Sequence, residues 1–285
     1  MLDATSLFKN LRSETGLPAY IRARGMIDAS FRSGSNGTAI QDLKETGGYR
    51  LKFPHAHVCE AIIVNTGGGM AGGDHLNVRL DLGENAHVMC STQSAEKIYR
   101  SDGAVSMIVN RLHLADHAHL VWLPQETILF DRARLRRQLN VNMASSAQFL
   151  ACEILVLGRH AMGETLQDAE LVDHWDIFRD EHLVYAERLR LQGDLQKHLK
   201  RKAVGGGARA IATLLYVSQN AESRLDDLRN FMSQNPEDCT EWGASAWNGL
   251  LCLRALSSNP FVLRRVMALC LTYLNQNPLP RVWYC

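Results

Sequence analysis

Strict alternation of apolar and polar residues is the feature of this sequence that most limits its fold. The segment "HLNVRLDL" (75–82) places apolar residues at every second position, and so do "YRLKF" (49–53) and "LNVNM" (139–143). A period of two is typical of strands with one buried face. The segment "EAIIVN" (60–65) is almost continuously apolar, which predicts a strand buried on both faces. Short connections separate these segments, so the pattern predicts a sandwich, a barrel or stacked sheets.

Helical patterns occur only in the second half of the chain. The first covers 145–158, where Ser145 and Gln148 fit a capping box and Gly158 fits the helix end. Further predicted elements are a hairpin over 170–191 that turns near Asp180, a helix over 222–232, and a helix from Pro260 to before Pro278. No internal repeat is evident. We expect one domain over residues 1–285, mainly β, with about two to three helices in its second half and disorder in about residues 1–20.

A glycine-rich stretch, "NTGGGMAGGD" (65–74), spells the dinucleotide-binding pattern G-x-G-x-x-G at Gly67, Gly69 and Gly72. That pattern binds a pyrophosphate only when a strand precedes the glycines and a helix N-terminus follows them. Here the alternating segment 75–82 predicts a strand after the glycines. We therefore expect no nucleotide binding. The glycines instead predict a sharp corner with close backbone approach, at which a partner could also dock.

The charge balance of the chain excludes several classes of partner. Lysine and arginine total 31 and aspartate and glutamate total 30, which gives a net charge of +1 at pH 7. Such a balance gives no general electrostatic reason to bind nucleic acid or an anionic membrane. No apolar run approaches the roughly 18–20 residues that span a bilayer, and the charged start "MLDATSLFKN" is unlike a signal peptide. We therefore expect a cytoplasmic protein without a membrane or nucleic-acid partner.

Five segments, in order, resemble the sequence blocks of one family. They are "NTGGGMAGGD" (65–74), "TQSAEKIYRS" (92–101), "WLPQETILFDRARLRR" (122–137), "CEILVLGRHAMGE" (152–164) and "PRVW" (280–283). These segments make the chain similar to the urease accessory protein D family, also called UreD or UreH. The resemblance covers the chain from about residue 22 to residue 283. One departure is that Asn65 and Thr66 stand where the family usually has proline before the glycines, which is expected to loosen the corner.

The resemblance implies a role that composition alone does not. Members of this family are not enzymes; they are scaffolds in the assembly of the nickel site of urease. They bind accessory protein F, which recruits the GTPase accessory protein G, and they contact apo-urease. They are thought to guide nickel through an internal passage, so the metal is transient and no cofactor is tightly bound. The family fold is mainly β, with antiparallel and mixed sheets stacked in a β-helix-like sandwich and two helices.

Oxygen-bearing side chains in the family blocks are the candidates for such a passage. Oxygen donors hold a nickel ion weakly enough to release it. The candidates are Thr92, Gln93, Glu126, Asp131, Glu153 and Glu164. Each also has an ordinary structural interpretation. Glu126 and Asp131 fit a solvated loop and a turn cap, Thr92 and Gln93 fit hydrogen bonding at a strand end, and Glu153 or Glu164 fits an ion pair with Arg159.

Three arginines at a spacing of two, Arg132, Arg134 and Arg136, predict a charged strand face. No aromatic residues are interleaved with them, so stacking on nucleic-acid bases is excluded. The arginines fit either a solvated face or a surface that meets an acidic partner.

The segment "PHAHVC" places His55, His57 and Cys59 on one side of an extended chain. Imidazole and thiolate groups suit nickel or zinc, so the three residues form a candidate metal site, with incidental histidines as the alternative. The rival function is a metal-dependent hydrolase that combines this cluster with Glu126. A second group, His113, His117 and His119, is interrupted by a predicted turn at Ala115–Asp116, and we attribute no site to it.

Overall fold

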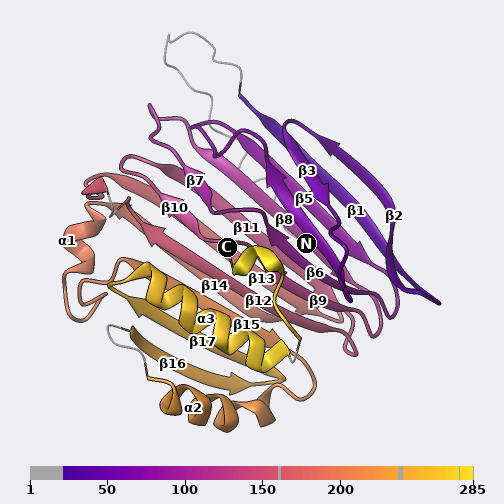
Figure 1. The fold of residues 1–285 in the computed structure, drawn as a ribbon. Coiled ribbons are helices and arrows are strands. Elements are labelled where there is room, and N and C mark those ends of the chain that lie inside the picture. The colour runs from indigo at the N-terminus through magenta and orange to yellow at the C-terminus, as the bar shows by residue number, and fades with distance from the viewer. Residues whose placement is uncertain (1–21, 160–161, 237–239, 276, 285) are drawn as a thin grey trace.

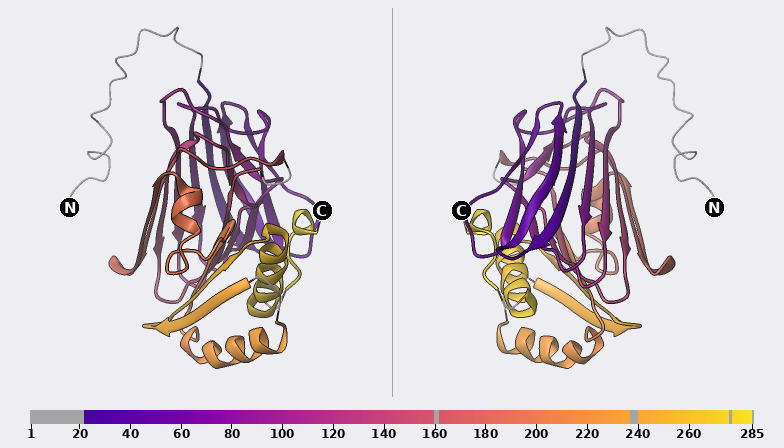
Figure 2. Two further views of the ribbon diagram at one scale, coloured as in Figure 1. Left: turned by 90° about the vertical axis from the view of Figure 1, so that its left-hand side faces the viewer. Right: turned by 90° about the vertical axis from the view of Figure 1, so that its right-hand side faces the viewer.

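The computed structural model describes residues 22–159, 162–236, 240–275 and 277–284. Two β-sheets pack face to face, and helices cover the far side of one of them (Figures 1 and 2). The mainly β, layered fold expected from the sequence is therefore confirmed. The predicted disorder of about residues 1–20 falls outside the described residues.

Sheet A has seven strands. In spatial order they are β14 (His182–Gly193), β13 (Ala169–Arg179), β11 (Arg134–Met143), β8 (Ser106–Leu114), β5 (His75–Leu82), β1 (Arg24–Gly34) and β2 (Gly37–Thr46).

Sheet B is longer. Its main path is β16 (Thr240–Trp247), β17 (Leu250–Ser257), β15 (Ala210–Val217), β12 (Gln148–Leu157), β9 (His119–Leu123), β6 (His87–Thr92), β4 (Cys59–Asn65) and β3 (Tyr49–Lys52). The short strands β7 (Glu96–Ile98) and β10 (Thr127–Leu129) pair beside β12.

The chain alternates between the two sheets in the centre of the molecule. From β4 to β13, the main strands of sheet B and those of sheet A follow one another along the sequence. Neighbours within each sheet in this region are parallel, as β5 is to β8 and β6 is to β9. This path is that of a β-helix flattened into a sandwich, as the resemblance implied. Antiparallel strands close the ends of both sheets.

Three turns that lead from sheet A to sheet B repeat the same structure. In each turn the backbone N–H of a buried alanine donates to the carbonyl three residues earlier, at 3.0–3.1 Å, and these alanines are Ala86, Ala118 and Ala147. Bonds between successive turns stack them, because His119 N–H donates to the Ala86 carbonyl and Gln148 N–H donates to the Ala118 carbonyl, both at 2.8 Å. The fold thus contains a structural repeat. Its turns share a short sequence pattern, because 83–87, 115–119 and 144–148 each begin with glycine or alanine and end with alanine followed by histidine or glutamine.

The segment 145–158 forms strand β12, so the predicted helix is wrong. Residues Phe149–Leu157 are buried on both faces, because sheet A covers one face and the helical layer covers the other. A strand of this kind is continuously apolar, and a continuous apolar run also contains apolar residues at helical spacing. Ser145 caps no helix; its backbone N–H donates to the Asp180 carboxylate at 3.0 Å.

The other predictions for the second half are confirmed. The hairpin β13–β14 turns at Asp180 and Glu181, both with positive φ. The helices are α2 (Leu225–Gln234), preceded by the 3₁₀ turn η3 (Glu222–Arg224), and α3 (Pro260–Asn275). The apolar side of α3 packs on sheet B, followed by the 3₁₀ turn η4 (Arg281–Trp283). The single-turn helix α1 (Leu195–Leu199) was not predicted.

Candidate functional site

The glycine-rich stretch forms a corner between β4 and β5, and no helix follows it. The Met70 N–H donates to the Lys97 carbonyl at 2.7 Å, and the Tyr99 N–H donates to the Met70 carbonyl at 2.9 Å. A Cβ added at Gly69 would lie 2.7 Å from the Lys97 carbonyl oxygen. The glycines therefore permit close backbone approach, as predicted, and provide no site of the dinucleotide type.

Asn65 and Thr66 hold this corner in place rather than loosening it. The Thr66 hydroxyl donates to the Gly48 carbonyl at 2.8 Å, and the Asn65 side-chain oxygen accepts from Gly67 N–H at 2.9 Å. These bonds replace the rigidity that proline would supply.

A partly buried polar cluster lies beside the corner. The Asn65 amide donates to the Tyr49 hydroxyl at 3.0 Å and to a Glu96 carboxylate oxygen at 2.9 Å. Burial raises the pKa of Glu96 to about 7, although the bond from Asn65 opposes this shift. Sequence reasoning missed Glu96, because its surroundings come from β3, β4 and the corner.

Glu153 lies in the core between the two sheets, in a strand rather than in the predicted helix. Its partner is Arg137 from the facing sheet, at 2.5 Å, and not Arg159 as predicted. Arg137 also bonds Asp173 at 3.0 Å through Nε and bonds the Thr127 hydroxyl at 3.1 Å. Burial raises the pKa of Glu153 to about 7, against the lowering effect of the Arg137 charge. One cation thus joins two buried carboxylates across the sandwich.

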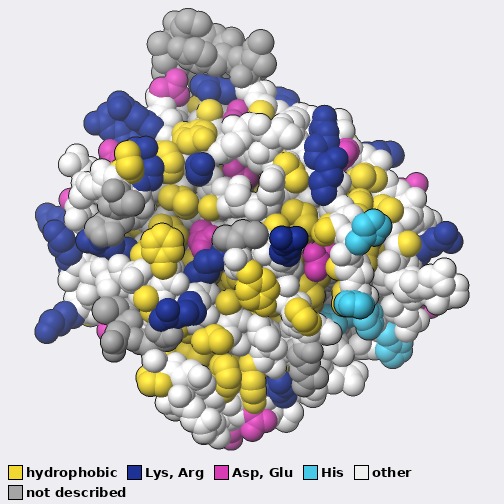
Figure 3. Space-filling model, in the orientation of Figure 1, with side chains coloured by type: hydrophobic (Ala, Val, Ile, Leu, Met, Phe, Trp, Pro, Cys, Tyr) yellow, Lys and Arg dark blue, Asp and Glu magenta, His cyan; other side chains and the backbone are white. Residues whose placement is uncertain are grey.

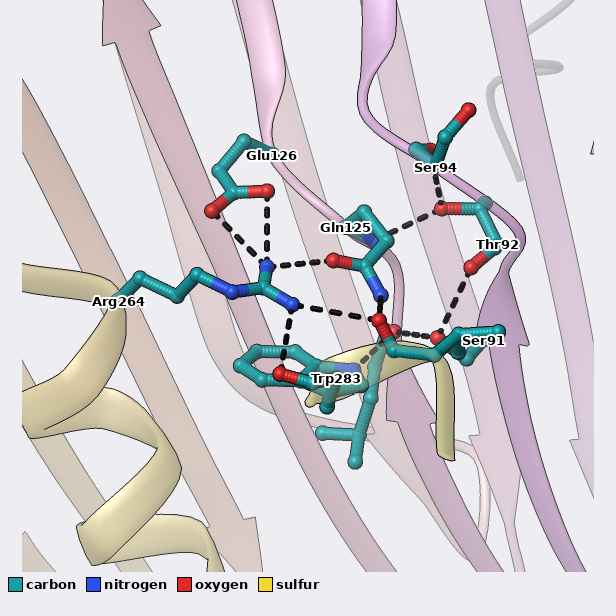
Figure 4. A network of polar contacts seen from close by, with 9 residues as sticks. Ser91, Thr92, Ser94, Gln125, Glu126, Arg264 and Trp283 are labelled. Carbon is teal, nitrogen blue, oxygen red and sulfur yellow. Dashed lines mark hydrogen bonds and ion pairs between the residues drawn. The ribbon is translucent and has the colours of Figure 1, made fainter. Parts of the chain in front are cut away.

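Glu126 belongs to a network that fastens the C-terminal elements to sheet B (Figure 4). Arg264 of α3 donates to both Glu126 carboxylate oxygens at 2.9 Å and to the Trp283 carbonyl at 3.0 Å. Gln125 bonds Arg264 and donates to the Val282 carbonyl at 2.7 Å. We call this network the C-terminal clamp.

Thr92 joins the C-terminal clamp from the end of β6. Its hydroxyl accepts from the Gln125 N–H at 2.9 Å and donates to the Ser94 carbonyl at 3.0 Å. The neighbouring Gln93 side chain is exposed, and its backbone N–H donates to the Ile63 carbonyl at 2.8 Å. The strand-end hydrogen bonding considered for both residues is therefore present.

Glu164 and Asp131 lie at the edge where the chain leaves β12 and β10. Arg159 bonds Glu164 through Nη2 at 2.9 Å and Nε at 3.1 Å, which confirms this predicted ion pair. These bonds lower the pKa of the Glu164 carboxyl. Asp131 caps a turn, since it accepts from the N–H groups of Gln167 and Asp168 at 2.8 and 3.2 Å. Five of the six passage candidates therefore lie in three separate places, which are the C-terminal clamp, the inter-sheet core and this edge, and the sixth, Gln93, is exposed after the end of β6.

The three arginines are only partly on one strand face. Arg134 and Arg136 alternate along β11 and reach Glu170 at 3.4 and 3.9 Å. Arg132 precedes the strand with φ of 62°, in a turn. Arg132 and Arg134 line a pocket of about 760 Å³ together with Arg22, Arg100, Asp102 and Asp168.

The candidate metal ligands of the first half are not assembled into a site. His55 and His57 are exposed, whereas Cys59 packs against the inter-sheet core. Burial raises the pKa of the Cys59 thiol and favours its protonated form, which is a poor ligand. Within the described ranges, no group of three or more His, Cys, Asp or Glu residues is placed to hold a metal ion. Nickel binding by these three residues stays a prediction.

Comparison with known proteins decides the family. The UreD urease accessory protein family profile matches residues 23–284. The chain belongs to the UreD family. Urease accessory protein UreD 1 of Methylobacterium radiotolerans is 47% identical over 248 residues, which cover 87% of this chain and 86% of the relative. UreD of Methylobacterium sp. strain 4-46 is 46% identical over 273 residues, covering 93% and 96%. UreD of Xanthobacter autotrophicus is 45% identical over 263 residues, covering 92% and 90%.

The UreD match extends from β1 to η4, so every site described above falls within it except Arg22 of the pocket. Membership places the chain among the accessory proteins of urease maturation. Among the described residues, no helix is long and apolar enough to cross a membrane.

Proposed function

We propose that this chain is a non-catalytic scaffold of urease maturation that binds accessory proteins F and G and apo-urease in the cytoplasm and passes nickel to urease. The observation that carries this proposal is the UreD match over residues 23–284. The rival, a metal-dependent hydrolase, needs three ligands and an open position on its metal. It finds no support among the described residues, where Glu126 is bound by Arg264 and Cys59 is turned to the core.

Nickel passage is best supported by carboxyl groups that can exchange a proton for a cation near neutral pH. A carboxylate must be deprotonated to bind metal, so its affinity changes most steeply around its pKa. Glu96 and Glu153 both have pKa values raised to about 7 by burial. Glu153 shares Arg137, whose positive charge opposes a second cation. Glu96, which is bonded by the neutral Asn65 amide, is the stronger of the two candidates.

The arginine-lined pocket supports an acidic partner surface. Guanidinium groups bind carboxylates through paired hydrogen bonds. Arg132 is half-exposed at the rim, with a long ion pair of 3.7 Å to Asp131. An Arg132→Ser variant should therefore weaken the complex, and the loss should shrink as salt is added.

One co-purification experiment tests both the scaffold and the passage. The chain, accessory proteins F and G and apo-urease are expressed together, and complex formation and urease nickel content are measured in the same preparation. We expect Glu96→Gln to leave the complex intact on a sizing column and to lower the nickel content several-fold.

Two further variants complete the design. Glu84→Gln, in an exposed turn, is the matched control and should change neither measurement. Glu126→Gln should loosen the C-terminal clamp, so it should impair assembly as well as nickel delivery. Normal nickel content in Glu96→Gln would remove Glu96 from the passage. Failure of the unaltered chain to join the complex would refute the scaffold itself.

A further inference from the structure

The stacked turns place two histidines next to each other at the start of sheet B strands. His87 and His119 each directly follow the buried alanine of their turn, and they are paired in the parallel register of β6 and β9. Gln148 occupies the same position in β12. In these strands, every second residue after the ladder position faces the helical layer, as Met89 and Val121 do. The register of these strands therefore stacks the three side chains in a short ladder.

The geometry of the two imidazoles suits a shared metal ion. Their ring centres are 5.6 Å apart and their planes cross at 76°. Two imidazoles on one ion have ring centres roughly 4.5–6.5 Å apart, since each metal–nitrogen bond is about 2.0–2.1 Å long. The observed separation falls within this range without movement of the strands. Figure 3 shows histidine side chains gathered towards the right of the face that carries α3.

The inner histidine has an unused ligand atom. His119 is partly exposed, but its Nε2 atom is buried and has no hydrogen-bond partner among the described residues. Buried polar atoms are nearly always paired, so an orphan atom of this kind indicates a missing partner.

We propose that His87 and His119 together bind a divalent transition-metal ion of the class that includes nickel and zinc. Imidazole nitrogens suit these ions. Water, or a side chain of a partner, fills the remaining coordination positions. Because the chain supplies only two ligands, the ion is held less tightly than in a closed four-ligand site and can be passed on. His87 is exposed, so the ion can reach the pair from solvent.

This site lies at the opposite end of β6 from the C-terminal clamp. β6 begins at His87 and ends at Thr92 in the C-terminal clamp, a span of about 16 Å at 3.3 Å per residue. As a receiving point for nickel, the pair extends the proposed function and rests on it. Metal binding itself can be measured without urease, so the two ideas can fail separately.

The test is a calorimetric titration of the purified full-length chain with Ni²⁺ and, separately, Zn²⁺ at pH 7.5. We expect a binding event that weakens about tenfold or more in His87→Gln and in His119→Gln, and that disappears in the double variant, because each substitution removes one of two ligands. His117→Gln removes an exposed histidine of the adjacent turn and is the matched control. It should titrate like the unaltered chain.

If His119→Gln does not fold, His87→Gln still tests the proposal, because it replaces an exposed side chain and leaves the core undisturbed. Circular dichroism of each variant checks the fold. Unchanged affinity and stoichiometry in His87→Gln would overturn the proposal. So would loss of the same binding event only in a His55→Ala, His57→Ala, Cys59→Ala triple variant, which would assign the metal to that segment.

Discussion

Replacing Arg137 with methionine leaves two buried carboxylates without a cation. Arg137, Glu153 and Asp173 are 7%, 5% and 4% exposed, so water cannot stand in for the lost guanidinium. Removing one partner of a buried ion pair costs about 3–5 kcal/mol. We therefore expect the free energy of unfolding of Arg137→Met at pH 8 to fall by this amount. At about 2–4 °C per kcal/mol for a chain of this size, the melting temperature falls by about 6–20 °C.

Urea titration followed by tryptophan fluorescence measures the effect, since Trp122 donates to Glu153 at 3.4 Å. The loss should shrink at pH 5. Loss of the Arg137 charge, which lowers the pKa of Glu153, raises that pKa further above its value in the unfolded chain, so protons taken up at low pH stabilise the fold. Arg134→Met removes a partly exposed arginine from the same strand and should cost less than about 1 kcal/mol. Equal losses in the two variants at pH 8 would refute the reasoning.

Two further predictions follow from the buried carboxyl and the glycine corner. The folded-state pKa of Glu153, about 7, exceeds its ordinary value of 4.5, so ionisation of this group opposes folding. The free energy of unfolding should fall as pH rises from about 4.5 to about 7, and Glu153→Gln should flatten that part of the urea-unfolding profile; an unchanged profile would mean that another group titrates. Gly72→Ala would place a Cβ 2.8 Å from the Ala104 carbonyl oxygen and should cost about 1–3 kcal/mol in a thermal melt. Gly243→Ala, which meets nothing within 4 Å, is its control, and equal melting temperatures would show that the corner can shift.

The strands of the first half could be predicted because the alternation of apolar and polar residues in each strand follows the burial of its two faces. In 75–82 and 139–143, one face meets the core and the other meets solvent, and the sequence alternates accordingly. β12 could not be recognised in this way, because both of its faces are covered and the alternation is lost. The stacked turns are likewise defined by backbone hydrogen bonds, which many residue types can make.

The sequence predicts which residues could form the site, but not which residues they pair with. The carboxylates of the family blocks were singled out, yet the cation beside Glu153 comes from the facing sheet, and the cation beside Glu126 comes from α3. The neighbouring sequence correctly predicts the partner of Glu164, because Arg159 is only five residues away. The pairing of His87 with His119 depends on strand register, which single strands do not encode.

The C-terminal clamp also sets the order in which the chain can fold as it is made. The Trp283 indole N–H donates to the Leu123 carbonyl across a separation of 160 residues. At a synthesis rate of about 5–20 residues per second, this interval takes about 8–30 s. During that time β12, β15 and β17 are made, and the apolar side of sheet B that they build lacks α3 until the end of the interval. The newborn protein is therefore most prone to aggregate late in translation, and a ribosome that stalls before α3 releases a product with this surface still open.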